Sequence, residues 1–297
     1  MFSNFVVQEV FKIILLGTLV VLFIAVNALF IVWMERKVSA RIQLRRGPLH
    51  VGSHGLLQTL ADAVKLLSKE LAFPKQSDKF CYWLAPILVF APLLCAFIIL
   101  PLSEHWIIRD LNVGFLFVFS LTNIGFIGIF IAGWSSNNKY ALLGAMRAVA
   151  QMISYEIPLL LSTMGVVMAA GSLQMTSIVA AQDKNWFIIT QPLAFIIFLC
   201  SSLAEANRAP FDIPEAESEL VAGFHTEYSG MKFAMFFIGE YTNVFVISAI
   251  ATTLFLGGWH GPILPPAIWF LIKTYGIISV LMWVRWTFPR VRVDQLM

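Results

Sequence analysis

The sequence predicts an all-α membrane protein, a polytopic bundle of transmembrane helices that forms a single domain over residues 1–297. Hydrophobic residues make up 59% of the chain and charged residues only 12%, which lies outside the range of water-soluble domains. The apolar residues also form long runs, and about 20 apolar residues in a helix suffice to cross a hydrocarbon core of about 30 Å. These observations exclude a soluble enzyme.

Seven apolar runs have the length of a membrane span, and Pro, Gly or charge marks most of their junctions. We expect spans at about residues 10–34, 81–102, 112–133, 142–170, 185–204, 232–257 and 263–284.

The basic residues are concentrated in the segments that follow odd-numbered spans. That set contains Arg36, Lys37, Arg41, Arg45, Arg46, Lys65, Lys69, Lys75, Lys79, Lys139, Arg208, Arg285, Arg290 and Arg292. The other face offers only Lys12, Arg109 and Lys184. By the positive-inside rule, the first set faces the cytoplasm of a bacterium or the matrix of a mitochondrion.

The first inner-face connection, residues 35–80, is basic and contains an amphipathic helix that we expect over residues 55–71. Its apolar stripe consists of Leu56, Leu60, Val64, Leu67 and Leu71. One interpretation is a membrane-surface helix whose basic side chains reach the headgroups. The other is a lateral wall around a molecule that enters from the lipid.

Four charged residues fall inside the expected spans, where each costs on the order of 2.5–3.5 kcal/mol to insert. They are Arg147, Glu156, Glu240 and Lys273. Together they predict a polar path through the bundle. The alternative is structural: Arg147 reaches the inner rim of the membrane, and Glu240 or Lys273 forms a buried ion pair that fixes two helices.

The second inner-face connection, residues 204–231, is acidic. It contains six carboxylates and one basic residue, Arg208, which gives a formal charge of minus five. These carboxylates belong to Glu205, Asp212, Glu215, Glu217, Glu219 and Glu227. We expect the two loops to neutralise each other and to form a pocket whose crowded carboxylates handle protons. A docking surface for a soluble partner is a compatible alternative.

The three cysteines offer no ligand set for a metal centre. Cys81, Cys95 and Cys200 are scattered, without a Cys-x-x-Cys pair. Neither an iron–sulfur cluster nor a zinc site can be assembled from this chain alone, so we expect no metal site.

Several ordered motifs resemble one family. They are Glu35-Arg-Lys37, Gln43-Leu-Arg-Arg-Gly-Pro48, Gly55-Leu-Leu-Gln58, Ala61-Asp-Ala-Val-Lys-Leu-Leu67, the segment from Arg147 to Glu156, Glu205-Ala-Asn-Arg-Ala-Pro-Phe-Asp212, Glu215-Ala-Glu-Ser-Glu-Leu-Val-Ala-Gly223, Glu240-Tyr-Thr-Asn243, Arg285-Trp-Thr-Phe-Pro-Arg290 and Asp294-Gln-Leu-Met297. From about residue 30 to the end, the chain resembles the family of the H subunits of proton-pumping NADH-quinone oxidoreductase (respiratory complex I), whose mitochondrial counterpart is NADH dehydrogenase subunit 1.

The resemblance implies a translocase subunit that forms much of the quinone chamber, couples quinone reduction to proton translocation and holds no cofactor by itself. Quinone would be the substrate. The residues carried over to the chamber and acidic loop are Arg36, Arg45, Glu205, Arg208, Asp212, Glu215, Glu217, Glu219 and Glu227. Those carried over to the proton path are Arg147, Glu156 and Glu240.

The resemblance also implies partners and a location. The partners would be the peripheral iron–sulfur and quinone-head-binding subunits, the small membrane-arm subunits and membrane lipid, without nucleic acid. The sequence around His225 favours a bacterial inner membrane over a mitochondrial one. Relatives continue beyond the Asp294-Gln-Leu-Met297 motif into an eighth apolar helix, whereas this chain stops at Met297 with seven expected spans.

Two other functions are compatible with parts of the pattern. The same subunit type anchors energy-converting hydrogenases and formate hydrogenlyase, although the long acidic and basic loops favour the quinone-using form. A stand-alone secondary transporter would use Arg147, Glu156, Glu240 and Lys273 along its substrate path, but the internal repeats common in transporters are not visible.

Overall fold

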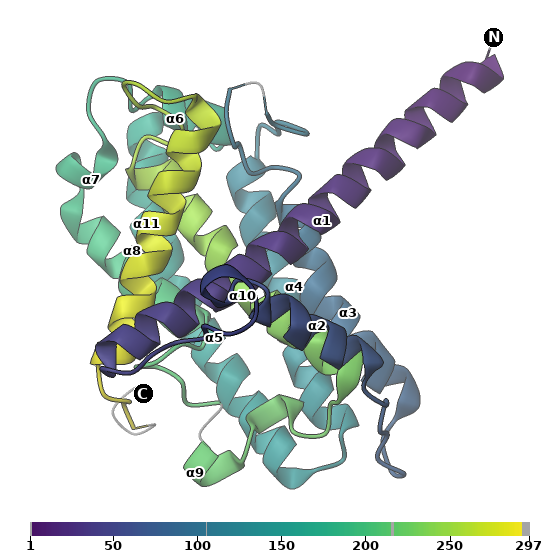
Figure 1. Cartoon of the computed structure of the whole chain (residues 1–297). Helices are drawn as coiled ribbons and strands as arrows, with labels where there is room; N and C mark the ends of the chain where they lie inside the picture. Colours follow the sequence, from purple (N-terminus) through teal and green to yellow (C-terminus); the bar gives the residue numbers. More distant parts are fainter. Residues whose placement is uncertain (1, 105, 215–216, 293–297) are drawn as a thin grey trace.

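The computed structural model describes residues 2–104, 106–214 and 217–292, and in these ranges all regular structure is helical (Figure 1). The α-helices are α1 Phe2–Ile42, α2 Gln58–Ser68, α3 Lys79–Ala96, α4 Gly114–Ser135, α5 Lys139–Ala170, α6 Met175–Ala180, α7 Phe187–Thr190, α8 Pro192–Glu205, α9 Glu217–Leu220, α10 Gly230–Phe255 and α11 Pro266–Thr287. Short 3-10 turns lie at Ser53–Gly55 and Gly223–His225. The predicted all-α fold class is confirmed.

Six of these helices are long and apolar enough to cross a membrane. They are α1 from Ile13, α3, α4, α5, α10 and α11. The expectation of one continuous helix over residues 185–204 is not met, because the chain forms α7 and then α8 on either side of Gln191. Pro192 lacks a backbone N–H and therefore starts a helix more readily than it continues one.

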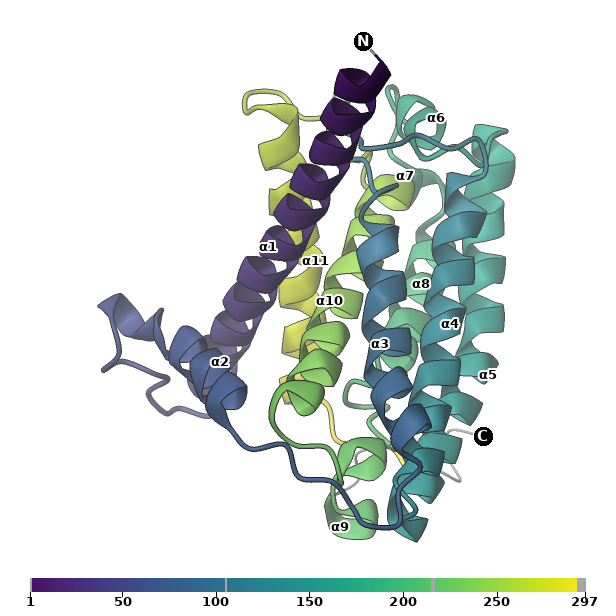
Figure 2. The same ribbon diagram turned by 90° about the vertical axis from the view of Figure 1, so that its right-hand side faces the viewer.

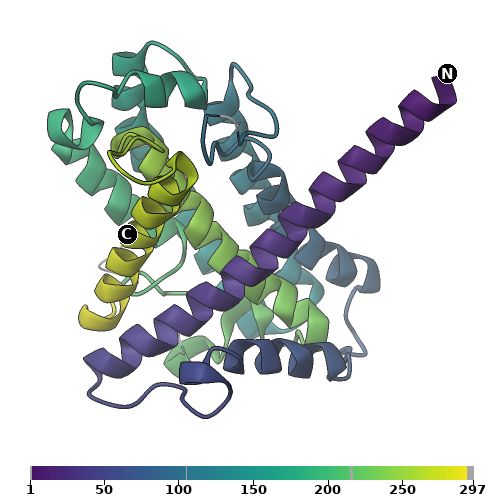
Figure 3. The same ribbon diagram turned by 45° about the horizontal axis from the view of Figure 1, so that its top comes forward.

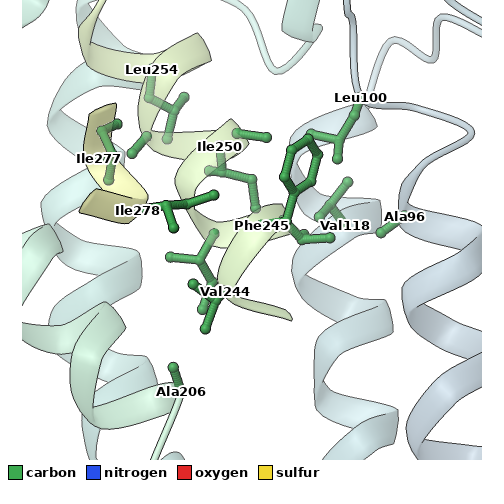
Figure 4. Close-up of a cluster of buried hydrophobic side chains, with 14 of the residues drawn as sticks. Ala96, Leu100, Val118, Ala206, Val244, Phe245, Ile250, Leu254, Ile277 and Ile278 are labelled. Carbon is green, nitrogen blue, oxygen red and sulfur yellow. The ribbon is translucent and has the colours of Figure 1, made fainter. Parts of the chain in front are cut away.

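The bundle is built around α10. Nearly every side chain from Tyr241 to Phe255 is buried, and α10 contacts α1, α2, α3, α8 and α11. In Figure 4, Phe245 points toward α3 and α4 residues, while Ile277 and Ile278 of α11 lie on the other side of α10. The second half of α10 is thus surrounded by apolar packing.

The polar connections gather at two ends of the bundle. Figure 2 shows α2, α9 and the C-terminal end of α11 at one end, with the N-terminal end of α1 and α6 at the other. The two inner-face loops predicted to share one face do share one end. The N-terminal part of α1 extends away from the other helices (Figures 1 and 3), and its side chains between Ile13 and Leu22 are largely exposed.

The amphipathic helix is shorter than predicted, since α2 covers Gln58–Ser68 of the expected residues 55–71. Before it, Gly55 has a φ of 75°, and a Cβ there would lie 2.3 Å from the Pro48 carbonyl oxygen. After it, the backbone becomes extended at Lys69. The side chains of the predicted stripe are exposed, namely Leu56, Leu60, Val64, Leu67 and Leu71.

Candidate functional site

A mainly apolar cavity of about 230 Å³ lies between α1, α2 and α10. Ala28 and Val32 of α1, Ala63 and Leu66 of α2, and Phe237 of α10 contribute to its walls. We call it the lateral cavity. It lies against the amphipathic helix, as the lateral-wall interpretation of that helix predicts.

The polar part of the lateral cavity is an ion pair between α1 and α2. Arg36 of α1 donates a hydrogen bond of 2.5 Å to Asp62 of α2, and both residues line the cavity. Gln58 also donates to Asp62, at 3.2 Å. The basic side chain is therefore neutralised within its own connection.

A second set of charges lies deeper in the bundle. Glu35, buried on α1, accepts a short hydrogen bond from Arg285 of α11. Tyr241 of α10 interacts with Glu35, and the Arg208 guanidinium carbon lies 4.6 Å from the centre of the Tyr241 ring. Arg208 in turn lies 3.6 Å from a Glu240 carboxylate oxygen. These five residues form what we call the buried charged row.

Tyr241 connects the two sites. It lines the lateral cavity together with Arg36, and it also lines a small space of about 20 Å³ inside the bundle with Glu35, Arg208 and Arg285. Its side chain thus lies between the lateral cavity and the charged side chains of Glu35, Arg208 and Arg285. Tyr241, Glu35 and Arg285 were missed as site residues, although each stood inside a family motif.

Beyond the buried charged row lies an inner cavity of about 50 Å³ between α3, α4, α5, α8 and α10. Glu240 and Glu205 both line it, and Glu205 is almost completely buried. The amide oxygens of Asn207 and Asn243, which also line it, have no hydrogen-bond partner among the described residues. A space of this size accommodates a few water molecules, and these oxygens offer them acceptors.

Glu156 continues the series into the space between α4 and α5. It accepts a hydrogen bond of 2.5 Å from Asn123 of α4, and its charge acts on Glu205. Gln151, one helical turn earlier, donates to the carbonyl oxygens of Ala204 and Phe211 at 2.7 Å each. The start of the acidic loop is thereby fixed to α5.

Arg147 lies at the inner end of α5, apart from Glu156. It donates a hydrogen bond of 2.5 Å to Glu219 of α9, an exposed side chain. This hydrogen bond and the charges of Arg147, Arg290 and Arg292 lower the pKa of the Glu219 carboxyl. Because the folded-state pKa is lowered, this contribution to stability exists above the carboxyl's ordinary pKa and is lost as the pH falls through the lowered value.

The remaining acidic residues are spread over the inner face. Glu227 accepts a hydrogen bond of 2.7 Å from Asn138, while its backbone carbonyl accepts one of 2.7 Å from Tyr82. Asp212 is partly buried at the start of the loop. Glu215 and the Glu217 side chain lie outside the described residues.

The prediction that the basic first loop neutralises the acidic loop stays a prediction, although three of the described residues have partners outside the opposite loop. Arg36 pairs with Asp62, and Arg45 donates to Gln43 at 2.6 Å. Glu219 instead pairs with α5. Glu219 has its partner on α5 because the fold places α5 and the C-terminal segment beside α9.

Lys273 belongs to neither the polar path nor an ion pair within the described part of the chain. Its ammonium group donates to the carbonyl oxygens of Leu256, Gly258 and His260 at 2.7, 3.0 and 2.7 Å, and it lies 4.4 Å from the centre of the Trp186 ring. These carbonyls follow the end of α10. Lys273 therefore stabilises a helix C-terminus, where a cation is favourable.

Lys273→Met is accordingly expected to lower the stability of the outer end of the bundle by about 2–4 kcal/mol, since three partly buried carbonyls lose a charged donor. Thermal unfolding of the purified protein in detergent measures this loss. Lys184→Met, a neighbouring exposed lysine, is the control and should leave the unfolding temperature unchanged. Equal unfolding temperatures for both variants would contradict the capping role.

Known proteins match nearly the whole chain. A profile of the family described as NADH dehydrogenase matches residues 15–297. The NADH-quinone oxidoreductase H subunit of Dehalococcoides mccartyi (strain CBDB1) is 53% identical over 285 residues, covering 95% of this chain and 80% of that protein. The corresponding H subunit of Geobacillus kaustophilus is 51% identical, covering 95% of this chain and 86% of that protein.

A third relative, the H subunit of Carboxydothermus hydrogenoformans, is 48% identical over 295 residues and covers 98% of this chain and 84% of its own length. The resemblance indicated by the motifs is thus confirmed. The chain belongs to the NADH dehydrogenase family, together with these H subunits of NADH-quinone oxidoreductases.

Proposed function

We propose that this chain is the multi-pass membrane subunit of a proton-pumping NADH:quinone oxidoreductase in a bacterial plasma membrane. The names of its relatives support the assignment to that complex. The structural observation that carries the proposal is the position of Tyr241, which lines both the lateral cavity and the space that holds the buried charged row. A lipid-soluble substrate and a set of proton-handling groups would meet there.

The lateral cavity suits the substrate. A quinone has a planar polar head and a long apolar tail, and the cavity offers mainly apolar walls with one ion pair, Arg36–Asp62. The exposed apolar stripe of α2 would lie in the lipid beside it. Electrons would come from an iron–sulfur cluster in a neighbouring peripheral subunit, because the scattered cysteines of this chain supply no cluster ligands.

The buried charged row would couple quinone chemistry to proton movement. Reducing a quinone takes two electrons and two protons, and the transient negative charge acts strongly on nearby charges in a medium of low dielectric constant. That charge would act on the ion pair between Arg208 and Glu240, in which a guanidinium nitrogen lies 3.6 Å from a carboxylate oxygen. Glu240 and Glu205 would then exchange protons through water in the inner cavity, and Glu156, which acts on Glu205, would continue the path.

The inner-face charges would organise the contact with the peripheral subunits. Among the predicted residues, Arg147 and Glu219 form an ion pair there, and Glu227 fixes the end of the acidic loop to the start of α5. Arg45 is exposed at the same end. Asp212, Glu215 and Glu217 remain proposed members of this acidic loop.

Filling the lateral cavity tests the proposed function. Ala63→Phe places a ring inside the cavity, and it should raise the KM for quinone about tenfold, equivalent to about 1.4 kcal/mol of lost binding. NADH:quinone activity would be measured on the complex purified through a tag on this chain, with its subunits identified. Ala61→Phe, on the exposed side of the same helix, is the matched control.

An unchanged KM in Ala63→Phe would contradict quinone binding in the lateral cavity. Copurification of hydrogenase subunits without quinone activity would instead support the anchor of an energy-converting hydrogenase.

A further inference from the structure

Lys232, in the first turn of α10, is buried with a relative exposure of 3% although it belongs to neither the lateral cavity nor the buried charged row. Its ammonium nitrogen has no hydrogen-bond partner among the described residues. A buried, unpaired cation is costly, so the surrounding groups must compensate for its lost hydration. The nature of those groups indicates what the lysine does.

Three aromatic rings surround the ammonium group. Its nitrogen lies 3.7 Å from the ring centre of Trp83, 3.9 Å from that of Phe73 and 4.3 Å from that of Tyr82. All three distances are well within the range of about 6 Å for attraction between a cation and an aromatic face. We call this arrangement the aromatic cage.

The aromatic cage joins three parts of the chain. Lys232 belongs to α10, and Tyr82 and Trp83 belong to α3. Phe73 comes from the segment of residues 69–78 that connects α2 to α3, which we call the strap. The strap has no helix of its own, so side-chain contacts must fix its position.

Other contacts fix the strap to the same turn of α10. Ser229 accepts a hydrogen bond of 2.9 Å from the Ala72 amide and donates one of 3.2 Å to the Glu70 carbonyl. Gly230 approaches the strap so closely that a Cβ would lie 3.0 Å from the Lys69 carbonyl oxygen. The start of α10 therefore holds the strap at several successive residues.

The strap follows directly on α2, which forms one wall of the lateral cavity. At the other side of α2, the Arg36–Asp62 ion pair ties the helix to α1. Together with the packing of α2 against α1 and α10, these two attachments restrain the wall. Displacement of the strap would thus change the width of the cavity.

We propose that Lys232 is a positioning residue for quinone binding: through the aromatic cage it fixes the strap, and through the strap it sets the position of α2 against the lateral cavity. The inference rests on the proposed quinone-binding function of that cavity. The contact between a cation and aromatic rings also predicts which substitution at Lys232 preserves the aromatic cage. Arginine retains a cation that stacks on aromatic rings, whereas methionine retains only the apolar stem.

The test compares Lys232→Met, Lys232→Arg and the control Lys65→Met, an exposed lysine of α2, in the assembled complex in lipid nanodiscs. The first measurement is hydrogen exchange of the backbone amides of residues 58–78, which reports local opening without reference to activity. Lys232→Met should speed exchange in the strap by about tenfold. Lys232→Arg should restore slow exchange, and Lys65→Met should not change it.

The second measurement is the KM for a short-tailed and a long-tailed quinone. Lys232→Met should raise both KM values severalfold with little change in kcat, and Lys232→Arg should restore them. If Lys232→Met does not assemble, Phe73→Leu removes one ring of the aromatic cage and serves the same comparison.

Unchanged exchange in the variants that lack the aromatic cage would overturn the positioning role. Faster exchange with unchanged KM values, together with a raised KM in Ala63→Phe, would show that the aromatic cage holds the strap without affecting quinone binding, which would overturn the positioning role. Unchanged KM values in both Lys232→Met and Ala63→Phe would instead contradict the proposed quinone binding in the lateral cavity.

Discussion

Replacing Arg285 by methionine is expected to remove most of the assembled protein from the membrane. Arg285 donates to Glu35 across the bundle, and Glu35 is buried. Removing one partner of a buried ion pair leaves an uncompensated charge, which typically costs about 3–5 kcal/mol. That loss is a large part of the total stability of a typical folded domain. The amount of intact complex on a native gel measures the effect.

A double substitution separates the lost pair from other effects of the change. Glu35→Gln with Arg285→Met removes both charges and should recover a substantial part of the assembled complex, since neither partner is left charged. Arg41→Met, at the exposed end of α1, serves as a control for a lost positive charge. If the double variant assembles no better than Arg285→Met, the cost does not come from an unpaired carboxylate.

The second large effect is expected for Glu240→Gln, with assembly retained. Glutamine is nearly isosteric with glutamate and still satisfies neighbouring hydrogen bonds, but it neither titrates nor pairs as an anion with Arg208, 3.6 Å away. Proton transfer between the buried charged row and the inner cavity would be interrupted. We expect proton-coupled quinone reduction in membrane vesicles to fall about tenfold or more, within the range attributed to a positioned acid or base.

Three measurements on the same vesicles make this prediction specific. NADH oxidation with an artificial hydrophilic acceptor reports the peripheral arm and should be unchanged, whereas quinone reduction and proton uptake should fall. Glu156→Gln should give the same pattern, because Glu156 acts on Glu205 at the inner cavity. Variants of Glu240 and Glu156 that assemble and translocate protons at the normal ratio would contradict the proposed path.

Much of the fold could be predicted from the sequence because the bilayer imposes a minimum length on every span. The runs that became α3, α4, α5, α10 and α11 were recognisable from hydropathy alone. The break at Gln191 was less visible, because the residues on both sides of it are apolar and a proline also occurs within α3 and α5 without ending either helix. Whether a proline starts a new helix or stays inside one therefore depends on tertiary contacts.

The sequence predicted the residues of the candidate site better than the pairs that these residues form. Glu205, Arg208 and Glu240 were recognisable as charged residues in motifs, and the structure brings them together around Arg208 and the inner cavity. The partner of each charge depends on how distant helices cross, which hydropathy does not encode. For the same reason, the sequence did not predict the role of Lys273. Its partners are backbone carbonyls, which every residue has and which no sequence pattern identifies.

The ion pair between Glu35 and Arg285 also sets a condition on biosynthesis. The two residues are 250 positions apart in the chain. At a translation rate of about 5–20 residues per second, the carboxylate on the first helix waits about 12–50 s before its arginine is made. During that interval, Glu35 lacks the arginine with which it pairs in the folded bundle. Complete insertion of α11 is then the event that releases the first helix into its final place.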